Sequence, residues 1–208
     1  MRSSAPSPRT RDRTRSRSRS ARSVRGLSAR RAAVVLKSDI EAFERLGYRP
    51  REGDSPYSVV LAAPEGGDDL VMHLRPEGRV FGGNWGLELS TAEPVLPATS
   101  RGITARGRGV VRMQGVRFRA RGGDEAASRL AAELSADREL GKALGDVHFE
   151  RLAVEPDGRP VIRHMGGSVV WLLVPPMART TPLPAGQPEA MVRALHEFAR
   201  AGARGLSA

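Results

Sequence analysis

The chain of 208 residues contains no cysteine. Disulfide bonds, cysteine nucleophiles and zinc sites with cysteine ligands are therefore excluded. A domain of this length buries enough apolar surface to fold without such cross-links. Aromatic residues are also scarce, at 4% of the chain, and residues 1–31 have none. That segment can neither build a core nor stack on nucleic-acid bases.

Long apolar runs are missing as well. No stretch approaches the roughly 20 apolar residues that a membrane-spanning helix needs. Arg30 and Arg31 precede an apolar run that ends before Lys37, which is shorter than the apolar region of an export signal. These absences predict a cytoplasmic protein without a membrane partner.

Lysine occurs only twice, so arginine supplies almost all of the positive charge. The net charge is +11, but residues 1–31 hold eleven arginines and one acid, which accounts for +10. The rest of the chain has 23 basic and 22 acidic residues, a net charge of +1. We expect a disordered basic tail at 1–31, a single globular domain at 32–202 and a short tail at 203–208.

Hydrophobic periodicity predicts an α+β fold. Apolar residues spaced by three and four predict a helix through Leu36 and Leu46 that ends at Gly47. A helix capped by Asp124 and another from Pro188 are also predicted. Strands are expected at 57–62, 70–75, 80–89, 109–113, 116–121, 147–154, 161–165 and 168–174. Short turns between them favour an antiparallel sheet built from two three-stranded meanders plus a hairpin, with helices packed on one face.

The longest apolar run, Val169–Val174, predicts a central strand buried on both faces. Trp171 should then lie in the core. The prolines at 175 and 176 are expected to end this strand, because proline cannot donate to a strand ladder. Residues 91–107 contain two prolines and scattered polar residues, and they are expected to form a loop.

One resemblance follows from the region around Trp171. The run Met165-Gly166-Gly167-Ser168-Val169-Val170-Trp171, followed by Pro175-Pro176-Met177 and a terminal helix, resembles uncharacterised bacterial proteins of a domain-of-unknown-function type. The similarity covers residues 32–202. It implies no known activity, ligand or site residue.

No catalytic, metal or cofactor motif is found in the sequence. The glycine pairs at 82–83 and 166–167 lack the Lys-Ser/Thr ending of a phosphate loop, and they are interpreted as bulges or tight turns. The histidines show no metal-ligand spacing, and the one in the last helix is expected on its solvent side. They are His73, His148, His164 and His196.

The arginines nevertheless provide a candidate site for nucleic acid. A flexible polycation binds phosphates without reading bases, and a basic strand face adds to it. Weak nonspecific binding is therefore considered for Arg13, Arg15, Arg17, Arg19, Arg117, Arg119 and Arg121. The competing interpretations are a merely solvated tail, a true start further along the chain, and an outer hairpin face whose arginines discourage aggregation.

Three functions are consistent with these patterns. The favoured hypothesis is a non-enzymatic binding or accessory domain whose partner and oligomeric state the sequence does not identify. The first alternative is an enzyme whose active site no motif locates. The second alternative is a nonspecific nucleic-acid-associated protein that acts through the arginine-rich tail. Salt-dependent binding to nonspecific DNA or RNA would separate the third from the first two, and a deep pocket lined by titratable groups would favour the enzyme.

Overall fold

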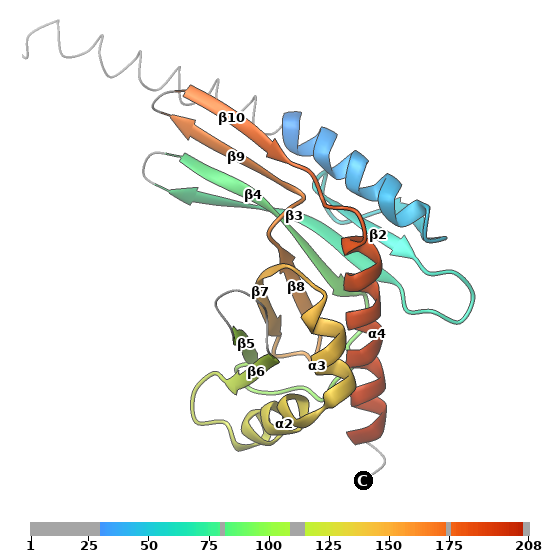
Figure 1. The fold of residues 1–208 in the computed structure, drawn as a ribbon, viewed down its shortest axis with the longest axis vertical. Helices are drawn as coiled ribbons and strands as arrows, with labels where there is room; N and C mark the ends of the chain where they lie inside the picture. Colours follow the sequence, from blue (N-terminus) through green and yellow to red (C-terminus); the bar gives the residue numbers. More distant parts are fainter. Residues whose placement is uncertain (1–29, 80–81, 109–114, 174–175, 206–208) are drawn as a thin grey trace, which may run out of the picture.

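In the computed structural model the described residues are 30–79, 82–108, 115–173 and 176–205. They confirm the α+β class, with an antiparallel sheet and helices beside it (Figure 1). A first helix covers residues 30–44. The elements that follow are β1 (Arg49–Glu52), β2 (Ser58–Ala62), β3 (Leu70–Arg79), β4 (Gly82–Thr91), β5 (Ile103–Arg108), β6 (Gly115–Ala120), α2 (Glu125–Ala136), α3 (Arg138–Gly145), β7 (Phe149–Val154), β8 (Pro160–His164), β9 (Ser168–Leu173), β10 (Pro176–Thr181) and α4 (Gln187–Gly205).

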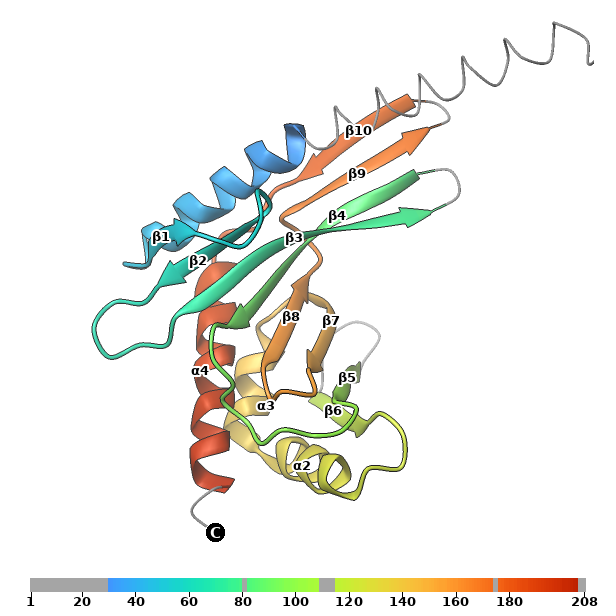
Figure 2. The same cartoon turned by 180° about the vertical axis from the view of Figure 1, so that it is seen from behind.

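The sheet divides at β4. One side of this strand pairs with β3, which continues to β2 and β1. On the other side, the C-terminal half of β4 pairs with β8 and its N-terminal half pairs with β9. From β8 the sheet continues through β7 and β5 to β6, while β9 continues only to β10. Figure 2 shows the two branches separating along β4.

A glycine bend lets the chain pass from β8 to β9. Gly167 has a φ of +66°, a conformation that favours glycine. A Cβ at this position would lie 2.7 Å from Leu87 Cδ2 and 2.9 Å from Asp39 Oδ2. The chain therefore leaves β4 after Arg163 and rejoins it at Val169 through a tight turn, the interpretation predicted for this glycine pair.

The helices cover one face of the sheet. Along β3 and β4 every second side chain faces the helices, because successive side chains of a strand point to opposite faces. Leu70, Met72 and Leu74 are fully buried on β3, and Leu87 and Leu89 continue this row on β4. They form one core with apolar residues of the first helix, α2, α3 and α4.

An aspartate caps the N-terminus of each of the two helices between β6 and β7. The Asp124 side chain accepts a hydrogen bond from the Ala127 N–H and caps α2, as the sequence predicted. Asp137 caps α3 in the same way, through the Leu140 N–H, so the helical stretch restarts there. Both helices contact β6 at the end of the sheet.

Several strand boundaries differ from the prediction. The first strand of the hairpin is β5, within a stretch that we expected to be a loop, and its ladder pairs Ile103 with Ala120. The expected strand at 109–113 lies outside the described residues. β3 continues through Pro76, where a turn was predicted, and pairs this proline with Trp85. Proline is tolerated there because β2 has already ended at the register of His73.

β9 is less buried than predicted, although it is paired on both sides. Trp171 is 6% exposed and lies in the core as expected. Val170 and Leu172 point to the other face and are 42% and 38% exposed. The prediction of burial on both faces was wrong because no described helix covers that face. The prolines were expected to end β9, and its described range stops at Leu173. The edge strand β10, which begins at Pro176, was not predicted.

Among the described helices, none combines the length and the apolar composition needed to cross a membrane.

Candidate functional site

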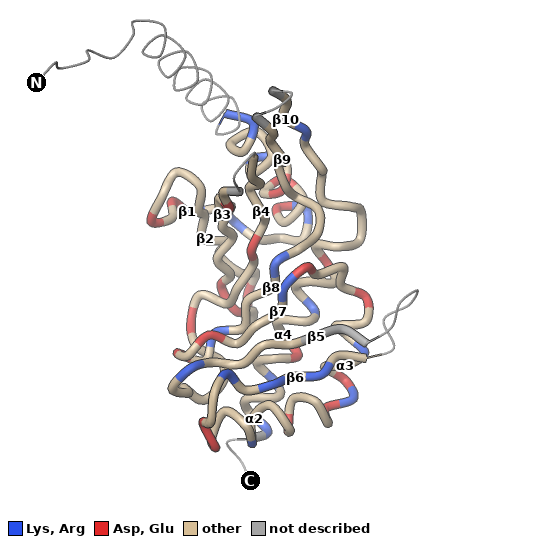
Figure 3. Tube along the Cα trace, turned by 90° about the vertical axis from the view of Figure 1, so that its left-hand side faces the viewer, with Lys and Arg blue, Asp and Glu red and all other residues tan. Residues whose placement is uncertain are grey.

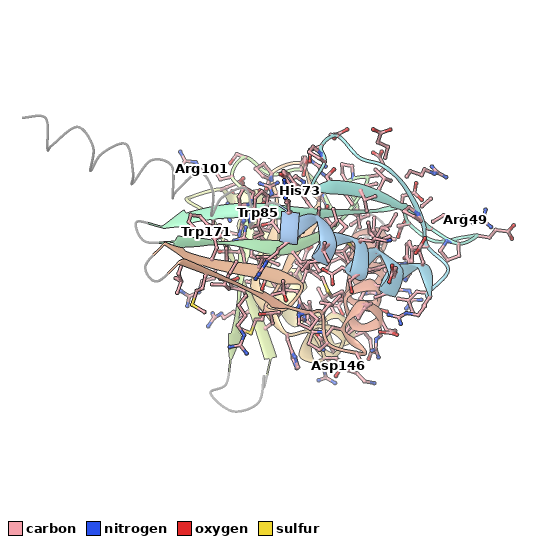
Figure 4. The ribbon with its side chains drawn as sticks, turned by 90° about the horizontal axis from the view of Figure 1, so that it is seen from above. Arg49, His73, Trp85, Arg101, Asp146 and Trp171 are labelled. Atoms are coloured by element: carbon pink, nitrogen blue, oxygen red, sulfur yellow. The ribbon has the colours of Figure 1, made fainter. Side chains whose placement is uncertain are left out.

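A cavity of about 310 Å³ lies on the face of the sheet that the helices leave open. Strands β2, β3, β4, β7 and β8 form its floor, and the β1–β2 and β7–β8 turns form its rim. His73 on β3 lies on the side of the sheet away from the first helix (Figure 4). The lining residues are Asp54, Ser55, Ser58, Val71, His73, Arg75, Glu88, Ser90, Arg151, Glu155, Arg159 and Val161.

Strand register aligns the polar floor of this cavity. Ser58 is opposite His73, which is opposite Glu88, and Glu88 is opposite Arg163, which is opposite Arg151. Directly opposed residues of antiparallel strands have Cβ atoms about 4.5–5.5 Å apart. Five strands thus bring five polar side chains into one continuous row across the sheet.

Glu88 is the centre of this row. Its side chain is only 5% exposed. Oε1 accepts hydrogen bonds from Arg163 Nε at 3.0 Å and Nη2 at 2.7 Å. Oε2 lies 2.6 Å from Arg75 Nε, and Oε1 lies 3.7 Å from Arg151 Nη1. A buried carboxylate is tolerated only with such partners, so Glu88 holds three guanidinium groups in place.

Arg163 is buried together with Glu88 and does not reach the cavity surface. Burial favours the neutral form, but hydrogen bonds to Glu77 and Glu88 outweigh it and raise the pKa of Arg163 above its ordinary value. Glu77 accepts from Arg163 Nη1. The positive charge of Arg163 is therefore neutralised by Glu77 and Glu88. These hydrogen bonds fix the side chains beneath the cavity.

Two other arginines are held at one nitrogen and open at the others. Arg75 contacts Glu88 through Nε. Arg159 Nε donates to Asp157 Oδ2 at 2.6 Å. No acceptor among the described residues bonds the terminal nitrogens of either arginine. Their side chains are 60% and 42% exposed, so these nitrogens are free to donate to a ligand.

Arg151, on β7, also lines the cavity. Its Nη2 donates to Glu155 Oε1 at 3.1 Å, and its side chain is 38% exposed. The carboxylates of Glu88 and Glu155 thus orient it from two sides. Orientation by fixed carboxylates lowers the conformational entropy that an arginine loses when it binds an anion.

His73 contributes a neutral imidazole to the floor. Burial and the positive charge of Arg75 lower the pKa of His73 below its ordinary value, against the opposite effect of Glu88. No hydrogen bond joins His73 to Ser58 or Glu88 among the described residues. The oxygens of Glu88 are occupied by arginines instead. The row of Ser58, His73 and Glu88 therefore lacks the hydrogen bonds of a nucleophile–base–acid triad.

The arginines singled out from the sequence do not lie in this cavity. Arg13, Arg15, Arg17 and Arg19 are outside the described residues. Arg117 and Arg119 are exposed on β6, and Arg121 follows it half-buried. Figure 3 shows the basic positions along β6, at the end of the sheet beside α2. Arg117 and Arg119 line a separate, open groove with α2.

The histidines are distributed over different environments. His148 and His164 rings stack 6.4 Å apart, and His164 Nε2 lies 2.9 Å from Gln187 Oε1. His196 lines a groove beside Tyr48 and is half-buried, so its expected placement on the solvent side of α4 was wrong. In the described ranges, no three His, Asp or Glu side chains gather into a group that could hold a metal ion.

Sequence reasoning did not identify the cavity. Alternation of Trp85, Leu87 and Leu89 places Glu88 on the opposite face of that strand, which is the one signal that could have singled it out. Its partner Arg163 lies 75 residues further along the chain. Nothing in either local sequence specifies the register that brings them together.

Comparison with known proteins identifies a family without a described activity. A family model described as "Protein of unknown function (DUF3156)" matches residues 42–201, so the chain belongs to this family. The resemblance to a domain of unknown function is thereby confirmed. No curated protein and no solved structure matches the chain.

Proposed function

We propose that this member of the DUF3156 family is a non-enzymatic binding domain that holds a small anion in the cavity on the open face of its sheet. The observation that carries the proposal is the pair Arg75 and Arg159. Each is anchored at Nε by a carboxylate, and its terminal nitrogens are bonded by no described residue. Carboxylate and phosphate groups accept two hydrogen bonds from such a guanidinium fork.

The size and setting of the cavity support a small ligand. Its volume of about 310 Å³ is near the lower limit of ligand pockets in general. The buried pair of Glu88 and Arg163 neutralises itself, so the cavity floor is rigid but not strongly charged. The exposed parts of Arg75, Arg151 and Arg159 are then the groups that meet a ligand.

Binding is favoured over catalysis by the arrangement of possible nucleophiles and bases. Ser58 has no hydrogen-bonded base among the described residues, and Glu88 is engaged by arginines. General acid–base chemistry requires a proton carrier within hydrogen-bond reach of its partner. An enzyme remains the alternative, with His73 as the residue to test, since its lowered pKa keeps the imidazole able to accept a proton at neutral pH.

Calorimetric titration of the full chain tests the proposal. Inorganic phosphate, citrate and glucose 6-phosphate are titrated separately at low ionic strength. We expect saturable binding of at least one of them, weakened about tenfold or more by Arg75→Gln or Arg159→Gln, because one charge-assisted contact is lost.

Arg49→Gln is the matched control, because Arg49 is exposed on β1 and lies at the outer edge of the molecule, apart from His73 (Figure 4). This variant should bind as the unaltered chain does. Circular dichroism verifies that each variant is folded. Absence of binding for all three anions, or equal loss in Arg49→Gln, would contradict the proposal.

A second candidate function is nonspecific binding of nucleic acid. It is supported by Arg117 and Arg119, which are exposed on β6 and pair with no carboxylate of the described residues. The tail arginines Arg13, Arg15, Arg17 and Arg19 would supply most of the charge. Affinity for duplex DNA should then fall with salt, with a slope of about −0.9 for each phosphate contacted.

Deletion of residues 1–31 distinguishes the contribution of the tail arginines from that of Arg117 and Arg119. Fluorescence polarisation with duplex DNA should lose its signal on deletion if the tail carries the binding. Binding that survives deletion but disappears with Arg117→Glu and Arg119→Glu assigns it to β6. A full chain that does not bind DNA even at low salt contradicts this second candidate.

A further inference from the structure

The lining of this cavity also contains hydroxyl groups. Ser58 on β2, Ser90 on β4 and Asp54 in the β1–β2 turn line the same cavity. Both serines are half-buried, and Asp54 is exposed. The cavity thus combines guanidinium donors with hydroxyl and carboxylate groups.

The hydroxyls of Ser58 and Ser90 are not used to stabilise the fold. No hydrogen bond to either side chain is formed by the described residues. Other serines of this chain do have internal partners, since the Ser135 hydroxyl donates to Ala131 O at 2.6 Å and Ser55 Oγ accepts from the Tyr57 N–H at 3.3 Å. A half-buried hydroxyl that faces a cavity without a partner is available to a ligand.

A close approach of two backbone segments positions Asp54 beside Ser58. A Cβ on Gly53 would lie 2.3 Å from Ser58 Oγ and 2.5 Å from the Ser58 carbonyl oxygen. Only glycine allows the β1–β2 turn to fold this tightly against β2. The Ser58 N–H also donates to the Ser55 carbonyl at 3.0 Å. The turn that carries Asp54 is therefore fixed beside Ser58.

From these contacts we infer that the ligand of the cavity is a hydroxylated organic anion of monosaccharide size, such as a sugar phosphate or a sugar acid. This inference rests on the proposed function. The exposed arginines of the cavity bind the anionic group, and the ligand hydroxyls bond Ser58, Ser90 and Asp54. Serine hydroxyls donate and accept, whereas the Asp54 carboxylate accepts, so together they match vicinal hydroxyl groups.

Polar recognition of this kind produces strong discrimination. A site with polar groups placed for a substrate hydroxyl rejects an analogue that lacks it, because those groups lose their partners. A bare anion contacts only the arginines of the cavity. A hydroxylated anion contacts the arginines and the hydroxyl groups, and it should bind more tightly.

Calorimetry of the full chain with four probes tests the inference. The probes are glucose 6-phosphate, glucuronate, inorganic phosphate and glucose. We expect glucose 6-phosphate or glucuronate to bind at least about tenfold more tightly than phosphate, which is the equivalent of one hydrogen bond. Which of the two binds more tightly distinguishes a phosphate from a carboxylate as the anionic group. Glucose alone should show no binding, since it lacks the charge.

Variants of Ser58 and Ser90 give the second measurement. Ser58→Ala and Ser90→Ala should each weaken binding of the hydroxylated anion about three- to tenfold and leave phosphate binding unchanged. Arg75→Gln should weaken both. Ser38→Ala, at an exposed position of the first helix, is the matched control and should change neither. Melting temperatures within about 2 °C of the unaltered chain show that the alanine variants are folded.

The outcomes separate this inference from the proposed function. Equal affinity for phosphate and the hydroxylated anions, with no effect of Ser58→Ala or Ser90→Ala, would overturn the inference and leave the anion site intact. If citrate or phosphate binds in a way that depends on Arg75 but the sugar anions do not bind, the inference is also overturned and the anion site remains supported. If no anion binds at all, both the site and its specificity are contradicted.

Discussion

Glu88 and Arg163 lie directly opposite each other on β4 and β8, where Arg163 bonds Glu88 Oε1 through two nitrogens, Nε at 3.0 Å and Nη2 at 2.7 Å. Their side chains are 5% and 7% exposed. Glu88 also contacts Arg75 and Arg163 also bonds Glu77, but those two partners are 60% and 41% exposed, so Glu88 and Arg163 are the buried charges of the network. Removal of one leaves the second in a medium that solvates it poorly.

Arg163→Met should lower the free energy of unfolding by about 3–5 kcal/mol, because the charge of Glu88 loses its buried partner. The double variant with Glu88→Gln should recover part of this loss, which urea denaturation measures. Arg151→Met is the control, since Arg151 is 38% exposed and its ion pairs contribute at most about 1 kcal/mol. Equal losses in Arg163→Met and Arg151→Met would refute the assignment.

Asp39 makes stability depend on pH in the direction opposite to an ordinary ion-paired carboxylate. It is 2% exposed on the first helix, and Oδ2 has no hydrogen-bond partner among the described residues. Burial raises the pKa of Asp39 from 3.8 to about 7, against a weaker opposing hydrogen bond from the Leu183 backbone. Between pH 3.8 and about pH 7 the folded protein therefore keeps a proton that the unfolded chain has released. The contribution of Asp39 to stability declines as the pH rises through this range.

Asp39→Asn should remove this dependence. The unfolding free energy of the unaltered chain, relative to the variant, should fall by up to about 4 kcal/mol between pH 4 and pH 8. Urea denaturation of both proteins at several pH values measures the difference, and all other titrating groups cancel in it. A constant difference across this range would show that Asp39 is ionised in the folded state.

Gly167→Ala tests the bend between β8 and β9. The positive φ and the close contacts with Leu87 and Asp39 leave no room for a methyl group. We expect a loss of about 2–4 kcal/mol in unfolding free energy. Gly141→Ala, at a position in α3 with no atom within 4 Å of an added Cβ, should instead stabilise by about 0.5–1 kcal/mol. A neutral Gly167→Ala would contradict the described geometry.

Trp171→Ala should lower the unfolding free energy by about 3–5 kcal/mol, the usual cost of truncating a large core residue. Its neighbour Val170 is 42% exposed, so Val170→Ala should stay within about 0.5 kcal/mol of the unaltered chain. Thermal or urea unfolding compares the two. Equal losses in the two variants would contradict the placement of Trp171 in the core and of Val170 on the exposed face of β9. A blue-shifted fluorescence maximum in a Trp85→Phe variant gives an independent check on burial of Trp171.

The sequence contained enough information for the elements whose apolar pattern is long and regular. The first helix, the Asp124 cap and the core position of Trp171 were predicted correctly. Local patterns failed where tertiary pairing decides the structure. Pro176 begins an edge strand, where one missing N–H is tolerated, and β5 forms because its neighbours β6 and β7 supply partners on both sides.

The candidate site was not predictable by the same means. Composition directed attention to Arg117, Arg119 and Arg121, which alternate with apolar residues on one strand. The arginines that line the cavity are single residues on separate strands and turns. Their common location depends on strand register, which follows from packing of the opposite face and not from any motif.

The division of the sheet at β4 also has a consequence for biosynthesis. Both halves of β4 receive their outer neighbours from one segment near the end of the chain, with Gly83 paired to Trp171 and Glu88 paired to Arg163. While the ribosome is still translating the α2 and α3 region, one edge of β4 has no partner. An unpaired edge is a template for association with other chains. The nascent protein is therefore most vulnerable to aggregation, and most dependent on chaperones, until β8 and β9 have emerged.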